Sequence, residues 1–367
     1  MFRLKQENYH KAAGLVRSRN ELSVFSVIGG IMPGIIYAND EDDPTAVLVI
    51  TSECNYLAGT TSDKEFNSSI KHIDELGFWD PLTPDTDEWA EIILQVHGNR
   101  FVREYTRRNY TLNKDDYRIR QVTVPEGFVL EKATPCDLRG KQYVNSDRLL
   151  DIISNWGTDE NYMKYGGIWY LRRGDIIASW SMVDCFYDNR VEIGVHTDAA
   201  YRKMGLGRAV VAANINDCYE RGVRSIGWHC TDINKGSIAI AEKMGFTLLN
   251  KYVSFTSYPP VENFHDLSEA EWNEWGEYFE NVSGYEPELL MEQLYAYVKA
   301  NNVGKTIKTV QAMMEAGKDV RYQHLSAKDG LLRLLDSIQY FRSIGMCSGF
   351  AGIEWAEFVE NTIGQAD

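Results

Sequence analysis

The sequence lacks paired cysteines and a membrane-spanning run. Its six cysteines are scattered, with no Cys-x-x-Cys pair. That spacing argues against a disulfide framework or a zinc cluster and is typical of a reduced, cytoplasmic protein. The opening residues, MFRLKQENYHK, are charged and polar, unlike a secretory signal. One uncharged stretch, 22–39, is interrupted by Gly29, Gly30, Pro33 and Gly34, which predicts two short strands joined by a turn. We therefore expect no membrane partner.

Positive charge is also scarce. Lys and Arg number 38 against 53 Asp and Glu, for a net charge of −15 at pH 7. An acidic chain repels phosphate backbones, so nucleic-acid binding is not expected, and cationic substrates are favoured. No metal is predicted either, because no His, Cys and Asp residues have the spacing of metal ligands.

The length of 367 residues predicts two or three domains at about 150 residues each. Residues 1–117 mix helical and strand patterns, and residues 118–258 contain a second α/β set that ends at Pro259-Pro260. In residues 259–367, Trp272, Trp275 and Phe279 recur at helical spacing, which predicts an all-α C-terminal region. These helices are candidates for binding a protein partner or for self-association.

The most informative motif is Arg202-x-x-Gly205-x-Gly207, between a predicted strand (191–197) and a predicted helix (205–221). Glycines at a strand–helix junction leave backbone N–H groups uncovered, and a helix start adds partial positive charge, so the motif predicts a pyrophosphate site. A plain tight turn is the alternative. The motif is neither a Walker loop nor a Rossmann dinucleotide turn, because it has no Gly-Lys-Ser/Thr and no GxGxxG with a later acidic residue.

A second motif follows in order. After the segment SIGWHC come Asn234-x-x-Ser237 and then the segment EKMGF, 242–246. Together with RKMGLG, these segments resemble motifs A and B of the GCN5-related N-acetyltransferases (GNAT), over about residues 127–258. The upstream segments NELSVFSVIGG-x-x-PG and NYLAG, with Trp-His-Cys before Asn234, extend the resemblance to the zwittermicin A resistance-type acetyltransferases.

The resemblance implies an α/β (α+β) fold with a mixed, mostly antiparallel sheet flanked by helices. It also implies that residues 1–117 form an α/β segment, which as a degenerate GNAT-like copy would have lost its cofactor loop. Such a copy would shape the substrate side or serve as a structural half. Acetyl-CoA would be the co-substrate. Its pyrophosphate would be bound by the amides from Lys203 to Arg208, and its pantetheine arm by Asn234 beside a splayed strand. The implied cofactor-binding residues are Val195, Arg202, Lys203, Met204, Gly205, Leu206, Gly207, Arg208, Asn234 and Ser237.

Glu192 is the first candidate for the general base, because many family members have a carboxylate at this strand position. Strand alternation puts Glu192, Gly194 and His196 on one face and the intervening valine and isoleucine residues on the other. A backbone N–H near residues 194–196 is expected to stabilise the oxyanion. Pairing of Glu192 with an arginine, or capping of a helix, is the alternative. His196 is a second catalytic candidate, although a packed histidine is favoured.

The position that usually provides the general acid departs from the family pattern. Many members have a tyrosine at the position of Ala241. Ser237, His229 or a water is the remaining candidate, and the thiolate can also leave unprotonated. A Cys230–His229 nucleophilic pair is not expected, because neighbouring strand residues point to opposite faces.

Three functions stay open from the sequence. The favoured one is an N-acetyltransferase acting on a small polar or cationic amine, such as an amino-containing antibiotic. Aromatic residues between 156 and 180 would line its cleft, unless they are ordinary core residues. The second is a non-catalytic acyl-CoA-binding module with a partner-docking helical region. The third is an acetyltransferase for protein lysines or N-termini, whose basic tails the acidic segment 262–292 would attract.

Overall fold

The computed structural model describes residues 1–16, 21–73, 75–76, 81–97, 103–141, 143–256, 267–283, 289–316, 321–322, 325–326, 348–350 and 361. The chain divides into two compact units, Met1–Glu262 and Asn263–Asp367. The expected boundary between residues 117 and 118 falls inside the first unit.

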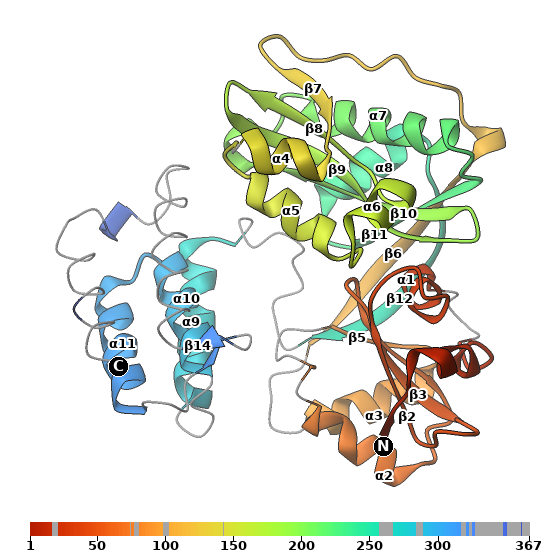
Figure 1. Cartoon of the computed structure of the whole chain (residues 1–367). Helices are drawn as coiled ribbons and strands as arrows, with labels where there is room; N and C mark the ends of the chain where they lie inside the picture. The colour runs from red at the N-terminus through yellow and green to blue at the C-terminus, as the bar shows by residue number, and fades with distance from the viewer. Residues whose placement is uncertain are drawn as a thin grey trace. The chain divides into compact units, whose positions relative to one another are not determined.

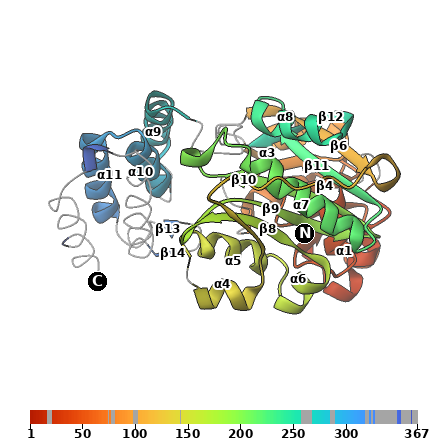
Figure 2. The ribbon, with the colours of Figure 1, turned by 90° about the horizontal axis from the view of Figure 1, so that it is seen from above.

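A twelve-stranded sheet runs through the described part of the first unit (Figures 1 and 2). The pairings β4–β5 and β10–β11 are parallel, and the other described pairings are antiparallel. The mixed, mostly antiparallel sheet is therefore confirmed. In spatial order the strands are β1 (Phe2–Arg3), β2 (Ile35–Ala38), β3 (Ala46–Ile50), β4 (Asn55–Gly59), β5 (Leu82–Pro84), β12 (Thr247–Thr256), β6 (Arg103–Asn113), β11 (Ser225–Thr231), β10 (Arg190–Thr197), β9 (Ile176–Tyr187), β8 (Ile168–Arg173) and β7 (Val129–Lys132).

Strand β6 joins the two halves of this sheet. It belongs to the first 117 residues, yet it lies between β11 and β12 and pairs antiparallel with both (Figure 1). Its Tyr110 and Leu112 are buried in the same core as Trp228 and Phe246. The sheet is thus continuous across the expected boundary. The strands of residues 118–256 form a continuous sheet only when β6, from the N-terminal part, lies between β11 and β12.

Helices cover both faces of the sheet. They are η1 (Gln6–Ala12), α1 (Leu22–Ile28), α2 (Lys64–Ser69), η2 (Ile70–His72), α3 (Asp87–His97), η3 (Lys114–Asp116), α4 (Pro135–Lys141), α5 (Ser146–Ser154), α6 (Asp159–Tyr165), η4 (Ala199–Tyr201), α7 (Leu206–Glu220) and α8 (Lys235–Met244). Helix α7 packs over β8, β9 and β10, and α1 packs on β9 and β10.

The expectation of two strands within residues 22–39 was wrong in its first half. Residues Leu22–Ile28 form helix α1, and only β2 is a strand there. The segment LSVFSVI has no charged residue, and its serines, Ser23 and Ser26, are buried with the apolar residues, so polarity shows no period that separates helix from strand. Packing decides the outcome: Val24 and Val27 are buried, and Phe25 stacks on Tyr187 of β9.

The side chains of β10 alternate as predicted. Val195 and Thr197 lie beside Gly207 of α7, on one face. His196 on the opposite face stacks on Trp180 of β9, and Arg148 of α5 lies over that indole. The register between β9 and β10 shifts between Glu192 and Ile193. Glu192 lies opposite Cys185 and Ile193 opposite Val183, so Asp184 is an additional residue of β9 between the two pairs.

Strands β10 and β11 separate after a short parallel contact. Their pairs are Arg190–Ser225, Val191–Ile226 and Glu192–Gly227. Both strands then continue, to Thr197 and Thr231, with no further pair between them among the described residues. The opening therefore begins at Glu192.

The described part of the second unit is mostly helical, as expected, but it is not all-α, because Arg321–Tyr322 and Leu325–Ser326 form a short antiparallel pair. Helix α10 (Leu290–Lys299) packs against α9 (Glu269–Ser283) and α11 (Val303–Ala316). Tyr297 of α10 lies against Gly276 of α9, and its hydroxyl donates to Glu280 at 2.6 Å. The described residues also include β13 (Arg321–Tyr322), β14 (Leu325–Ser326) and η8 (Ser348–Phe350). Among the described helices of the chain, none combines the length and apolar character that a membrane crossing requires.

The position of β6 generates a stability prediction. Leu112→Ala removes a side chain that is 3% exposed in the shared core, so we expect it to lower the free energy of unfolding by about 2–5 kcal/mol in urea denaturation. Leu94→Ala on α3, where the side chain is 50% exposed, is the matched control and should change it by less than about 0.5 kcal/mol. Equal effects of the two substitutions would contradict the placement of β6.

Candidate active site

The glycine motif forms a turn with two left-handed residues. Lys203 has φ +64° and Gly205 has φ +84°, and Gly205 is the N-cap of α7. The side chains of Lys203, Met204 and Arg208 are exposed. The first N–H groups of a helix have no intrahelical acceptors and carry partial positive charge, so this turn fits a phosphate group. Gly207 is buried where a Cβ would be 3.1 Å from Ile240, which explains the second glycine.

The other residues of the motif hold the turn against β10. Arg202 donates from Nε to the carbonyl oxygen of Thr197 at 3.3 Å, and Leu206 is buried in the core under α7. All six residues from Lys203 to Arg208 thus lie in one continuous turn and helix start. Whether they bind CoA stays a prediction.

The open edge of β10 presents the backbone of Val195. On the other edge, the carbonyl oxygens of Gly194 and His196 accept hydrogen bonds from Ser181 and Ser179 of β9, each at 2.8 Å. Because backbone groups alternate along a strand, the N–H and C=O of Val195 face β11, where the two strands have separated. An open N–H at this place suits the stabilisation of an oxyanion.

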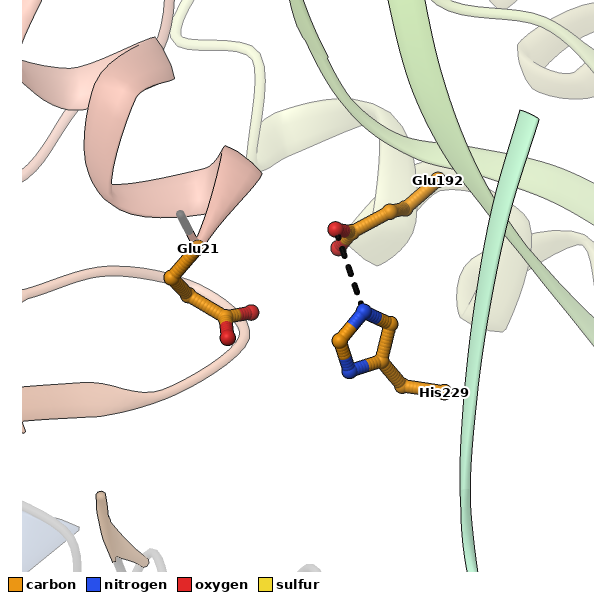
Figure 3. Close-up of side chains that lie close together, drawn as sticks. All are labelled: Glu21, Glu192 and His229. Carbon is orange, nitrogen blue, oxygen red and sulfur yellow. Dashed lines mark ion pairs between the residues drawn. The ribbon is translucent and has the colours of Figure 1, made fainter. Parts of the chain in front are cut away.

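Glu192 pairs with a histidine rather than an arginine or a helix start. Its Oε1 lies 3.3 Å from Nε2 of His229 on β11, and its Oε2 accepts from the Cys185 thiol at 3.4 Å (Figure 3). The two side chains are only 13% and 12% exposed. Burial alone would raise the pKa of Glu192, but the charge and hydrogen bond of His229, the hydrogen bond of Cys185 and the charge of Arg107 together outweigh burial and hold the pKa below its usual value.

The same pairing acts on His229 in the opposite direction. Burial lowers the pKa of the imidazole, but the charges of Glu192 and Glu21 outweigh burial, so the pKa is raised above its usual value. Each shift favours the charged form of its group, so the ion pair persists over a wider range of pH than the two groups would allow apart. The other ring nitrogen of His229, Nδ1, lies 2.8 Å from the hydroxyl of Tyr252 on β12.

The N-terminal half brings charged groups to this pair. Glu21, which precedes α1, is 6% exposed, and its carboxylate points toward Glu192 and His229 (Figure 3). Arg107 of β6 pairs across the sheet with Tyr252 and lowers the pKa of Glu192 by its charge. Although Glu53 keeps contact with solvent, desolvation by the surrounding protein and repulsion from Glu192 raise the pKa of its carboxyl.

Sequence reasoning missed most of these groups. His229 was named only as one possible acid, and Glu21, Glu53, Arg107 and Tyr252 were not named. The Trp-His-Cys segment was a signal for His229, since it precedes the Asn234 motif. The sequence carries no local signal for the groups from the N-terminal half. They reach this site only because the folded chain places β6 and α1 beside β10 and β11.

His196 has partners of its own. Its ring stacks on Trp180 with centroids 4.3 Å apart, and its Nε2 lies 3.0 Å from Oδ1 of Asp198. Asp198 is 3% exposed and also accepts from Asn145 and Arg148. Burial lowers the pKa of His196. These contacts are those of a histidine packed in the protein, the alternative favoured from the sequence.

Asn234 and Ser237 form the start of α8. The Asn234 side chain accepts from the backbone N–H of Ser237 at 3.0 Å, which caps the helix. The Ser237 hydroxyl accepts from the Trp228 indole at 2.9 Å. Ala241 is fully buried. Ser237 therefore has the local role of a helix-start residue, and its role as an acid stays a prediction.

The ligand atoms of Glu21, Glu192 and His229 lie within 4.8 Å of one another. Carboxylates and imidazole are zinc ligands, but a ligating histidine must be neutral. Here the pKa of His229 is raised by the two carboxylates, so metal binding would have to displace the ion pair.

Comparison with known proteins identifies the family. The GNAT acetyltransferase family model matches residues 13–255, and the chain therefore belongs to that family. The "Uncharacterized N-acetyltransferase YdfB" of Bacillus subtilis (strain 168) is 22% identical over 244 residues, which cover 64% of this chain and 89% of that protein.

A solved structure shares the fold of this chain. A GCN5-related N-acetyltransferase-like protein from Streptococcus suis 89/1591 is 24% identical, covers 68% of this chain and 98% of its own, and superposes with a TM-score of 0.54. A tandem GNAT protein from the clavulanic acid biosynthesis pathway is 12% identical, covers 70% of this chain and 96% of its own, and has a TM-score of 0.46.

The ion pair generates a prediction on pH dependence. The stability that Glu192 contributes is fully present above its usual pKa of 4.5 and is lost as pH falls through its lowered pKa. The stability that His229 contributes is fully present below its usual pKa of 6.5 and is lost as pH rises through its raised pKa. Glu192→Gln should therefore reduce the free energy of unfolding most between the usual pKa values of the two groups, measured by urea denaturation across pH. A loss that is the same at every pH would contradict the pairing.

Proposed function

We propose that the protein is an acetyl-CoA-dependent N-acetyltransferase whose acceptor is a small polar or cationic amine. Family membership supports acetyl transfer. The observation that carries the proposal is the placement of Glu192 where β10 and β11 begin to separate, on the same strand as the open edge at Val195. A base, an oxyanion donor and a phosphate-binding turn thus follow one another along β10 and the start of α7.

The carboxylate of Glu192 removes a proton from the attacking amine, directly or through water. The N–H of Val195 stabilises the oxyanion of the tetrahedral intermediate. The amides of residues 203–208 bind the pyrophosphate of CoA, and the start of α8 at Asn234 contacts the pantetheine arm. The chain's own groups thus orient the two substrates and move one proton at Glu192.

The charge around the base supports a cationic acceptor. Glu21, Glu53 and Glu192 bring three carboxyl groups to this place, and desolvation raises the pKa of the Glu53 carboxyl to about 7. His229 and Arg107 bring positive charge. Two of the three carboxyl groups, and Arg107, come from the first 117 residues. We propose that this half is a GNAT-like half that shapes the acceptor side, in a cytoplasmic protein close to the zwittermicin A resistance-type enzymes.

Turnover provides the direct test. The purified protein should release CoA from acetyl-CoA with an amine from a panel of polyamines, aminoglycosides and amino acids, measured with a free-thiol reagent. Glu192→Gln should lower kcat about 100-fold or more, with the Kd for CoA unchanged in calorimetry. Glu126→Gln changes an exposed carboxylate and is the matched control. Wild-type turnover in Glu192→Gln would exclude Glu192 as the base, and tight CoA binding without turnover would favour a non-catalytic acyl-CoA-binding module.

The turn at Gly205 is tested separately. Gly205→Ala forces an alanine to φ +84°, at a cost of about 1–2 kcal/mol, so the Kd for CoA should rise about 5- to 30-fold in calorimetry. Gly140→Ala is the matched control, because an added Cβ has nothing within 4 Å there. An unchanged Kd in Gly205→Ala would place the pyrophosphate elsewhere.

A further inference from the structure

We propose that Glu21, Glu192 and His229 form a binding site for one transition-metal dication of the zinc class, and that an ion bound there inhibits the enzyme. The ion site stands on the geometry of the three side chains, whereas inhibition rests on the proposed function. Glu21 precedes α1, Glu192 lies on β10 and His229 on β11. Because the ligands come from three separate elements, no metal-ligand spacing is visible in the sequence.

The three side chains bring one donor atom each to a single place. These atoms all lie within 4.8 Å of one another, and Oε1 of Glu192 is 3.3 Å from Nε2 of His229 (Figure 3). Two ligands about 2.0–2.1 Å from a tetrahedral zinc ion are about 3.3 Å apart, so this pair already has the spacing of two zinc ligands. The Glu21 carboxylate reaches the same spacing by moving at most about 1.5 Å.

Neighbouring groups orient two of the donors as a metal requires. In metal sites the ring nitrogen that does not bind the ion usually donates to an oxygen, and the binding carboxylates accept hydrogen bonds of their own. Here Nδ1 of His229 lies 2.8 Å from the Tyr252 hydroxyl, which leaves Nε2 directed at Glu192. Oε2 of Glu192 accepts from the Cys185 thiol at 3.4 Å, which leaves Oε1 for the ion.

The fold brings Glu192 and His229 together at the start of the opening between their strands. The pairing of β10 with β11 ends at Glu192 and Gly227, and His229 is two residues further along β11, on the same face as Gly227. A Cβ at residue 227 would be 2.8 Å from Cγ of Glu192, so glycine makes room for the Glu192 side chain there. All three ligands are mostly buried, which shields a bound ion from water.

The donor atoms determine the class of ion. One imidazole nitrogen with two carboxylate oxygens suits zinc and related transition metals, whereas sites made only of oxygen suit Mg²⁺ and Ca²⁺. Two carboxylates balance the charge of a dication, while Arg107 opposes the ion and Glu53 adds a further carboxyl group. The ion takes the Nε2 lone pair, so a proton on that nitrogen leaves to solvent. It also occupies the oxygen with which Glu192 would take a proton from an amine.

Zinc binding is tested without turnover. Calorimetric titration of the full chain with ZnCl₂ should show one ion per chain, in a step that MgCl₂ does not produce. Tyr252→Phe should raise the Kd of this step about 10- to 100-fold, the usual effect of losing the hydrogen-bond partner of a ligand. Glu21→Gln and His229→Gln remove a ligand, so each should raise the Kd by more than about 100-fold. His72→Gln and Glu126→Gln change exposed side chains, and the Kd should stay unchanged.

Two results would overturn the ion site. One is a Kd that neither Glu21→Gln nor His229→Gln changes, and the other is loss of the step in Cys136→Ser, which removes only an exposed thiol. Anomalous X-ray scattering from zinc-soaked crystals of the wild-type protein locates the ion without any variant. A peak between the three side chains is expected, and zinc peaks only elsewhere would also overturn the site.

Inhibition is tested with an amine that supports thiol release, preferably a monoamine, which binds zinc weakly. Zn²⁺ should lower kcat/KM, EDTA should restore it, and Glu21→Gln should raise the inhibiting concentration by the same factor as the Kd. Unchanged turnover with the site occupied, or turnover that requires the ion, would overturn the inhibitory role. Absence of thiol release by the metal-free protein with every amine would instead overturn the proposed function, and calorimetry would still decide the ion site.

Discussion

The position of β6 between β11 and β12 is the constraint on which the first unit depends. It places a strand from the first 117 residues inside the sheet that carries the family motifs. The core that contains Trp228 and Phe246 is completed by Tyr110 and Leu112 of that strand. The two halves consequently share a sheet and a core, rather than only a surface between them.

The candidate site has the same shared origin. Strands β10, β11 and β12 supply Glu192, His229 and Tyr252, whereas Arg107 comes from β6 and Glu21 from the residue before α1. The ion pair of Glu192 and His229 is mostly buried, and burying it without neighbouring charges and hydrogen bonds would be costly. Cys185, Tyr252 and Arg107 provide those neighbours, so the chemistry of the pair depends on both halves.

Local patterns predicted a large part of this structure. The strand at 191–197, the glycine turn and the two helices after it follow from hydrophobic periodicity and from Gly205 and Asn234, whose conformations act within a few residues. Strand alternation alone placed Glu192 and His196 on one face of β10. His196 was a catalytic candidate for which packing was favoured, and its contacts to Trp180 and Asp198 agree with packing.

What the sequence could not predict depends on distant contacts. Residues 22–28 have no amphipathic period, and burial against β9 makes them a helix. Arg107 and Tyr252 lie far apart in the sequence and meet only through the pairing of β6 with β12. Pairing partners across more than a hundred residues leave no trace in spacing or composition, so this cluster of side chains was not visible as a motif.

The shared strand also bears on how the protein is made. During synthesis, β6 leaves the ribosome well before β11 and β12, the two strands that flank it, and residues 103–113 must wait until residue 256 has emerged. One edge of β6 lacks its partner until residue 231 has emerged, and the other until residue 256. Unpaired edges of this kind associate readily with other chains. The sheet that makes the site complete is therefore the last part of the first unit that translation allows to close.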